Sequence, residues 1–235
     1  MQRVLLLVSF CFLSLSTAMQ AQDDSLSRGG AGGFWIGYGT FDVEDLQVFL
    51  PADFPTLSNN FLMFGGGGYG HFNNFLLGGS GQGMIGKEES TDSLSASVNA
   101  GMGFLNLGYM VIHNEDFRLY PMVGIGFGGL TMQLAQNGVL TPDAIVAKPG
   151  NETQISQGGL MLDFSASVEL MLFKEQQPDG TWGGMMLGLT AGYMLSPQSN
   201  DWSYAGGDIN GGPDFGLSGF YARLSIGGYG YEAAK

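Results

Sequence analysis

The sequence predicts an all-β fold, an eight-stranded antiparallel up-and-down transmembrane β-barrel, and three observations support this prediction. The segment Leu160–Phe173 alternates two kinds of residue over fourteen positions, which is the period of a β-strand. Seven further segments are strand-like and almost free of charge. The connections between the segments alternate between long or polar and short, as in barrels that cross a bilayer.

The segment Leu160–Phe173 has two chemically distinct faces. One face is apolar and holds Leu160, Leu162, Phe164, Ala166, Val168, Leu170 and Leu172. The other is mixed and holds Met161, Asp163, Ser165, Ser167, Glu169, Met171 and Phe173. The run is longer than the roughly 5 or 6 residues usual for a globular strand and exceeds the roughly 9 to 11 that cross a bilayer at a tilt.

The eight expected strands are residues 34–41, 61–72, 75–86, 94–111, 117–134, 160–173, 182–195 and 215–231. Only four charged residues lie inside them: Arg118, Asp163, Glu169 and Arg223. A soluble sheet would carry charge along its wet faces. The pattern is explained if the outward face lies in lipid and the charges pair inside a narrow lumen. We therefore expect these four residues to form an ion-paired plug.

The first 21 residues have the features of a signal peptide. Arg3 precedes an apolar run, Val4–Leu15, and cleavage is compatible with a position after Ala18 or after Ala21. About 12 apolar residues are too few for a spanning helix, which needs about 20. Cys11 is the only cysteine and is removed with this segment, so the mature chain is expected to have neither a disulfide nor a thiolate metal site.

The remaining chain is expected to form one domain. Residues 22–33 are polar and glycine-rich and are predicted to be a flexible lead, residues 34–231 to be the barrel, and residues 232–235 to be a short tail. The net charge of −13, from 21 acidic and 8 basic residues, argues against nucleic acid as a partner, because phosphate binding needs clustered Lys and Arg.

The short connections carry turn residues: Asn73-Asn74, residues 112–116 and Pro178-Asp179-Gly180. Aromatic residues flank them, including Phe72, Phe75, Tyr109, Phe117, Tyr120, Phe173, Trp182, Tyr229 and Tyr231, and are interpreted as an interfacial girdle. On these features the sequence resembles the small eight-stranded outer-membrane barrels of Gram-negative bacteria, the OmpA/OmpX type. The resemblance implies an outer-membrane location, with membrane lipid and the barrel assembly machinery as partners. The family commonly ends on an aromatic residue, whereas here Tyr231 is followed by four more residues.

Two glycine motifs lack the context that their chemistry needs. Residues 124–129 match GxGxxG and residues 81–88 resemble a phosphate-binding loop, but a strand pattern rather than a helix follows the first, and Glu88 stands where a hydroxyl should hold magnesium in the second. Glycines on both faces leave the register of Gly65–Gly68 and Gly78–Gly83 open. The two histidines, His71 and His113, fall at short connections, so no catalytic set, cofactor or metal site is expected.

Two long connections hold candidate binding residues. Asp201, Asp208, Asn210 and Asp214 place oxygen ligands around glycines, as calcium loops do, but the full spacing and the closing bidentate Glu are missing, so a solvated acidic loop is the preferred interpretation. In the first long connection Asp42 can cap a short helix that Pro51 ends. Its apolar residues Phe49, Leu50, Phe54 and Leu57 form either a lid or a contact surface for an extracellular partner, whose identity the sequence leaves open.

The expected function is a structural or surface-interaction role in the outer membrane through acidic extracellular loops. No open pore is expected, because eight strands enclose little more than side chains. One alternative is an outer-membrane barrel that binds or modifies lipid. A second is a secreted or periplasmic soluble β-barrel that binds an apolar ligand, in which the apolar faces would turn inward.

Overall fold

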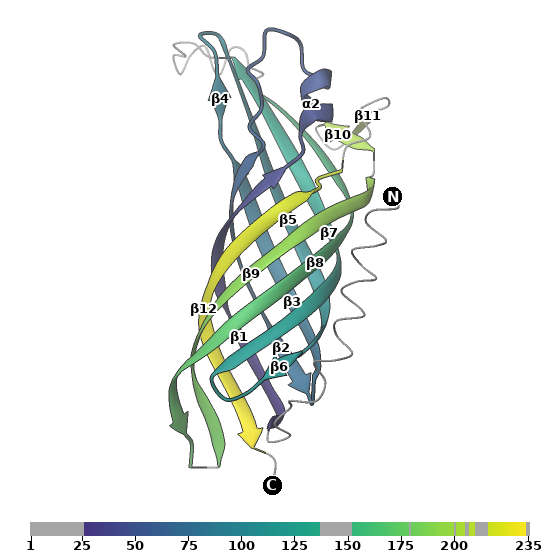
Figure 1. Ribbon diagram of the computed structural model, residues 1–235. Helices are drawn as coiled ribbons and strands as arrows, with labels where there is room; N and C mark the ends of the chain where they lie inside the picture. The colour runs from purple at the N-terminus through teal and green to yellow at the C-terminus, as the bar shows by residue number, and fades with distance from the viewer. Residues whose placement is uncertain are drawn as a thin grey trace.

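The computed structural model describes residues 26–136, 152–178, 180–199, 201–204, 207–209 and 216–233. Eight long strands form its wall: β1 (Leu26–Phe41), β2 (Asn60–Phe72), β3 (Phe75–Gly86), β5 (Leu94–Tyr109), β7 (Phe117–Gln136), β8 (Glu152–Gln176), β9 (Thr181–Ser199) and β12 (Gly219–Ala233). Each pairs antiparallel with the long strand that follows it, and β12 pairs with β1. The sheet therefore closes into the predicted barrel (Figure 1).

The strand register fixes the tilt of the wall. A row of paired residues followed once around the barrel runs through Gly30, Gly70, Leu77, Leu107, Val123, Phe164, Tyr193, Phe220 and Thr40. The row returns to β1 ten residues further along, from position 30 to position 40. For eight strands this shear gives a tilt of about 40° from the barrel axis, within the range of outer-membrane barrels.

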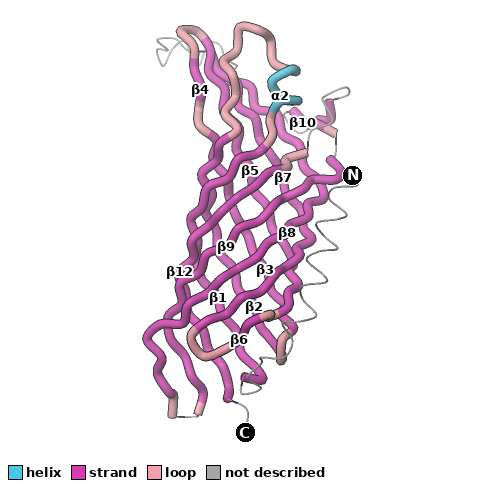
Figure 2. The backbone as a smooth tube through the Cα atoms, in the orientation of Figure 1, coloured by secondary structure: helices cyan, strands magenta, loops and turns pink. Residues whose placement is uncertain are grey.

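The two ends of the barrel differ, as the alternation of long and short connections predicts. One end, called here the loop end, carries the short elements α2 (Glu44–Phe49), β4 (Glu89–Ser90), β10 (Trp202–Tyr204) and β11 (Gly207–Ile209). The other, the turn end, carries the short connections, β6 (Ile112–His113) and the end of β12. Figure 2 shows the loops gathered above the strands at the loop end. None of the helices in the described ranges is both long and apolar enough to cross a membrane.

Side chains on the outward face are apolar and exposed. Phe34, Phe127 and Phe220 are 77%, 73% and 71% exposed, and Leu, Ile and Val occupy further outward positions around the wall. Such a continuous apolar surface is far larger than the patches that monomeric soluble proteins expose. It matches the lipid-facing band of a transmembrane barrel. The soluble alternative, in which the apolar faces turn inward, is therefore wrong.

Strand β8 confirms the faces predicted for Leu160–Phe173 at all but the last position. Five of its residues point into the lumen and are buried: Met161, Asp163, Ser165, Ser167 and Glu169. The exception is Phe173, which is 78% exposed. Its φ is 51°, and the pairing with β9 shifts between Leu172 and Glu175, so a local irregularity turns its side chain outward.

The predicted flexible lead is wrong for residues 26–33, which are the first half of β1 and pair with both β2 and β12. The composition resembles a linker, but here glycine permits close strand packing. A methyl group at Gly33 would lie 2.3 Å from the carbonyl oxygen of Ile226, and one at Gly227 would lie 2.1 Å from that of Gly32. The barrel therefore closes through glycine on both strands.

The glycines with uncertain register have a regular place in the wall. Those at outward positions form four rows across paired strands: Gly183, Gly230, Gly30 and Gly70; Gly228, Gly32, Gly68 and Gly79; Gly66, Gly81 and Gly103; and Gly83, Gly101, Gly129 and Gly158. Each row lies two residues nearer the loop end than the row before it. It also begins at a strand that is one or more positions further around the barrel. The residues between them, among them Tyr69 and Gln82, therefore face the lumen.

The aromatic girdle is confirmed only in part. Phe72 and Phe75 are exposed on the outward face beside the first short turn. Tyr120, Tyr229 and Tyr231 are instead buried in the lumen. Position near a strand end does not determine which face an aromatic residue occupies, because adjacent residues in a strand point to opposite sides.

Candidate functional site

The lumen near the turn end holds a layer of buried polar side chains around Glu169. Tyr69 and Tyr120 donate hydrogen bonds to Oε2 and Oε1 of Glu169, each at 2.5 Å, and Nη1 of Arg118 donates to the Tyr69 hydroxyl at 3.2 Å. Arg118 is fully buried and also lies over the ring of Tyr229, with 5.7 Å from Cζ to the ring centre. The Arg118 guanidinium and the Glu169 carboxylate therefore each contact neutral aromatic side chains, and the opposite charge of the other group also stabilises each of them.

The predicted pair Arg118 and Glu169 is in the lumen, but it is not a direct salt bridge. The two are register partners in β7 and β8, and the Tyr69 hydroxyl bridges their side chains. Within the described residues, the salt bridges lie outside the lumen: Lys87 with Glu89, and Lys174 with Glu115 and Asp116. Sequence reasoning missed Tyr69 because the glycines before it in β2 hide which way its side chain points.

A second polar layer lies closer to the loop end. Tyr221 donates a hydrogen bond to Oδ1 of Asp163 at 2.8 Å, and Nη1 of Arg223 donates to Oε1 of Gln82 at 3.2 Å. The guanidinium of Arg223 lies 4.5 Å from the ring centre of Trp35. Asp163 and Arg223 are thus both in the lumen as predicted, but each is held by neutral side chains rather than by the other.

A cavity of about 70 Å³ lies between the two layers. Its walls are polar and include Glu169, Arg223, Asn106, Thr190 and several serines. On one side of the lumen, inward glycines of β1, β2 and β3 have no side chain and so leave space for the cavity. A space of this size and polarity is sufficient for a few water molecules, since one water needs roughly 10–15 Å³. The polar layers and this cavity give the turn-end half of the lumen polar groups, beside two small buried hydrophobic clusters that include Met171 and Met186 in one and Leu76 and Met110 in the other.

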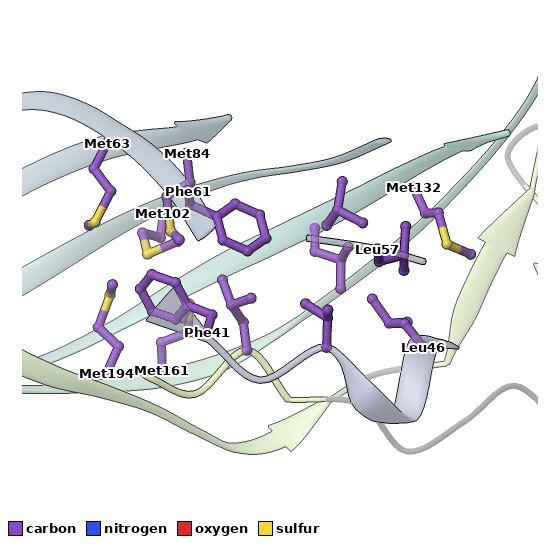
Figure 3. Packing of buried hydrophobic residues seen from close by; sticks show 14 of the residues in the cluster. Phe41, Leu46, Leu57, Phe61, Met63, Met84, Met102, Met132, Met161 and Met194 are labelled. Carbon is purple, nitrogen blue, oxygen red and sulfur yellow. The ribbon is translucent and has the colours of Figure 1, made fainter. Parts of the chain in front are cut away.

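The loop-end half of the lumen is filled by a hydrophobic core. Figure 3 shows Met63, Met84, Met102 and Met194 gathered to one side of Phe41 and Phe61, with Leu46 and Leu57 on the other. Each of these methionines is at most 7% exposed, and each comes from a different strand. Methionine side chains adapt to irregular spaces, which suits them to the packing of this part of the lumen.

The first long connection closes this core from outside. Asp42 accepts a hydrogen bond from the backbone N–H of Glu44 at 3.0 Å, and the predicted helix is present as α2. Its N-cap residue is Val43, so the prediction that Asp42 caps it is wrong by one position. Val43 and Leu46 are buried in the core beneath it. Oε1 of Gln47 accepts a 2.7 Å hydrogen bond from the backbone N–H of Leu57, which ties the returning chain to the helix. The connection is a lid.

The proposed contact surface on this connection is therefore wrong for the residues whose side chains are described. Leu50 and Leu57 are 7% and 6% exposed in the core, and Phe54 packs against it. The side chain of Phe49 lies outside the described part. Leu50, Phe54 and Leu57 pack toward the barrel instead, because the loop folds back over the open mouth.

The two histidines meet at the turn end, as their positions near short connections predict. Their ring centres are 4.8 Å apart and their planes are nearly perpendicular, at 88°. His113 lies in β6, outside the eight long strands. Burial, the Arg118 guanidinium and His71, in decreasing order, lower the pKa of the His113 imidazole from 6.5 to about 4. The ring of His113 is therefore neutral at pH 7.

The candidate calcium ligands are only partly described. Asp201 and Asp208 are exposed at the loop end, while Asn210 and Asp214 lie outside the described residues. Across the described ranges, no group of three or more His, Cys, Asp or Glu side chains is arranged to hold a metal ion. The calcium site stays a prediction.

The described residues of the loop end offer carboxylates, hydroxyls, amides and the amine of Lys87. The only two histidines of the chain lie at the turn end, and the only cysteine is Cys11. Nucleophilic catalysis by a serine or threonine needs a neighbouring base, most often histidine. A hydrolase at the loop end would therefore need another base, such as a carboxylate or a lysine.

Comparison with known proteins gives distant likenesses. No family model and no curated protein matches the chain. Among solved structures, Ail, the attachment invasion locus protein of Yersinia pestis, is 13% identical with a TM-score of 0.44, covering 87% of this chain and 99% of its own. The outer membrane protein OprG from Pseudomonas aeruginosa is 11% identical with a TM-score of 0.37, covering 88% and 96%. The outer membrane protease OmpT from Escherichia coli is 9% identical with a TM-score of 0.33, covering 92% and 99%.

The location of the protein follows from its own surface. A closed barrel satisfies every backbone group of its wall internally, which is the condition for a sheet to cross a bilayer. The outward side chains are apolar, and the polar groups lie in the lumen and at the two ends. The closed ring of eight antiparallel strands and its apolar outward face identify the chain as an outer-membrane β-barrel protein.

Proposed function

We propose that the protein is a closed outer-membrane barrel with a structural role that presents an acidic loop end to a basic partner outside the cell. It conducts no solutes through its lumen. The orientation follows from the parity of the connections, because bacterial outer-membrane barrels have short periplasmic turns and long outer loops.

The absence of a pore is supported by the filling of the lumen. Arg118, Glu169 and their tyrosines cross the turn-end half, and the methionine-rich core with its lid fills the loop-end half. The only sizeable space described between them has a volume of about 70 Å³ and is separated from the loop end by that core. Eight-stranded barrels are in general just wide enough for side chains to fill.

The surface role is supported by charge, and this is the observation that carries the proposal. Eight carboxylates are exposed among the described residues of the loop end: Asp42, Glu44, Asp45, Asp53, Glu88, Asp92, Asp201 and Asp208. The one basic residue described there is Lys87, which is paired with Glu89. A field of one sign attracts partners of the other sign and speeds their encounter at low salt.

Conductance in planar lipid bilayers tests the first half of the proposal. The mature barrel is expected to give no defined current steps under conditions in which a trimeric porin does. Stable, reproducible steps would overturn the closed-lumen part of the proposal and would require that the core and both polar layers rearrange.

Binding of fluorescent polylysine to cells that display the barrel tests the second half. The triple variant Glu44→Gln, Asp45→Asn, Asp53→Asn is expected to bind at least threefold less probe at low salt, and the difference should shrink at high salt. Glu232→Gln, which neutralises an exposed carboxylate at the turn end, is the matched control and should bind as the unaltered barrel does. Equal binding by the triple variant would overturn the surface role.

A second function, binding of an apolar ligand beneath the lid, is favoured by the methionine-rich core. Adaptable thioether side chains are common where a surface must accept different apolar shapes. A fluorescent fatty acid that binds the barrel, and is lost on Met102→Lys, would support this function. The same result would not affect the prediction of no ion conductance.

A further inference from the structure

His71 and His113 are buried, and within the described residues each ring has one nitrogen, Nε2, without the hydrogen bond that a buried imidazole nitrogen usually makes. They come from β2 and β6, and each is 5% exposed. The Nε2 atom of each ring has no hydrogen-bond partner in the described part of the chain. Buried polar atoms are nearly always satisfied, so two unpartnered nitrogens on touching rings require an explanation.

The hydrogen bond of His71 determines which of its nitrogens carries the proton. Nδ1 lies 3.3 Å from the carbonyl oxygen of Asn73. A carbonyl oxygen can only accept, so Nδ1 is the N–H donor and Nε2 of the neutral ring holds a lone pair. Metal-bound histidines typically use this arrangement, in which one nitrogen donates to a carbonyl and the other binds the ion.

The spacing of the rings fits a shared ion. An imidazole nitrogen lies about 1.1 Å from its ring centre and about 2.0–2.1 Å from a bound transition-metal ion. Two rings bound to one ion at the tetrahedral angle would have centres about 5.1 Å apart. The observed separation is 4.8 Å.

The backbone of β1 runs close to the His71 nitrogen. Gly29 is the register partner of His71, and a methyl group at Gly29 would lie 2.6 Å from its Nε2, 2.5 Å from the carbonyl oxygen of Gly230 and 2.9 Å from Cβ of Tyr231. The pairing of β1 with β12 therefore requires glycine at this position, whether or not an ion binds.

From these observations we propose that His71 and His113 form a two-histidine site for a borderline transition-metal ion of the zinc and copper class at the turn end of the lumen. With only two protein ligands, water completes the coordination, and the ion is exchangeable rather than structural.

Arg118 contributes to the site in two opposing ways. It is the register partner of His113, and its Nε is a third buried atom without a hydrogen-bond partner in the described chain. A water molecule bound to the ion would accept a hydrogen bond from this N–H. The guanidinium charge repels the ion, but Glu169 offsets that charge through the Tyr69 hydroxyl. Binding is therefore expected to be weaker than in sites with carboxylate or thiolate ligands.

Copper binding to the mature, untagged barrel in detergent micelles tests the proposal. The chain has only two histidines, so any imidazole signal comes from this pair. Electron paramagnetic resonance with Cu²⁺ at pH 7 is expected to show one ion per barrel with hyperfine structure from two imidazole nitrogens. A spectrum with one imidazole nitrogen, or with oxygen ligands only, would overturn the proposal.

Variants separate this site from the acidic loops. His113→Phe keeps an aromatic ring of similar size and is expected to weaken copper and zinc binding at least tenfold. Asp208→Asn, at the exposed loop end, is the control and should bind as the unaltered barrel does. Unchanged affinity in folded His113→Phe would overturn the proposal, and if that variant does not fold, the spectrum of the unaltered barrel still decides it.

Discussion

Replacing Glu169 with alanine is expected to destabilise the barrel strongly, because three buried groups depend on its carboxylate. Tyr69 and Tyr120 would lose their acceptor, and Arg118 would lose the negative charge that compensates its own. Removing one partner of a buried charged pair costs about 3–5 kcal/mol. A buried donor left without a partner costs about 1–3 kcal/mol. Water entering from the adjacent cavity would offset part of this, so we expect a loss of about 3–5 kcal/mol in the free energy of unfolding.

Urea unfolding of the barrel in lipid vesicles, followed by tryptophan fluorescence, measures the change. Glu169→Gln keeps an acceptor oxygen and isolates the effect of the charge, so its loss should be smaller than that of Glu169→Ala. Asp208→Ala removes an exposed carboxylate and should alter stability by no more than about 0.5 kcal/mol. Equal stabilities for Glu169→Ala and Asp208→Ala would refute the idea that this layer holds the turn-end half together.

Three further predictions follow from the core, the glycines and the first strand. Leu46→Ala, in the fully buried core of the lid, should cost about 2–5 kcal/mol locally and expose residues 42–59 to protease, whereas Val48→Ala, at a position 86% exposed, should not. Gly126→Ala should prevent formation of the heat-modifiable folded species, because its methyl group would lie 1.9 Å from a carbonyl oxygen of β5, whereas Gly101→Ala has no atom within 4 Å and should fold normally. Deleting residues 26–33 should abolish folding in detergent, since it removes half of β1; a folded product would contradict the closure of the barrel.

The sequence was sufficient for most of the wall because the wall imposes a period on it. Alternation divides β8 into two faces, and the scarcity of charge in the strands together with the parity of the connections then assigned Asp163 and Glu169 to the lumen. The connections also alternate in length, because neighbouring strands are joined by tight turns at one end of the barrel and by long loops at the other.

Features that depend on contacts between distant strands could not be predicted. Tyr69 follows four glycines, and glycine carries no information about which face of a strand points inward. The bridge from Arg118 through Tyr69 to Glu169 joins β7, β2 and β8, and no local pattern encodes it. The same limit explains why residues 26–33 resembled a linker, because the partners that make them a strand lie in β2 and β12.

The lid at the loop end depends on the closed barrel beneath it. Val43 and Leu46 are buried among side chains from several strands, so α2 has a surface to pack against only when those strands are paired. The hydrogen bond between Gln47 and Leu57 then joins the helix to the returning chain. The lid and the loop-end half of the wall therefore stabilise each other, and loosening either one exposes the same core.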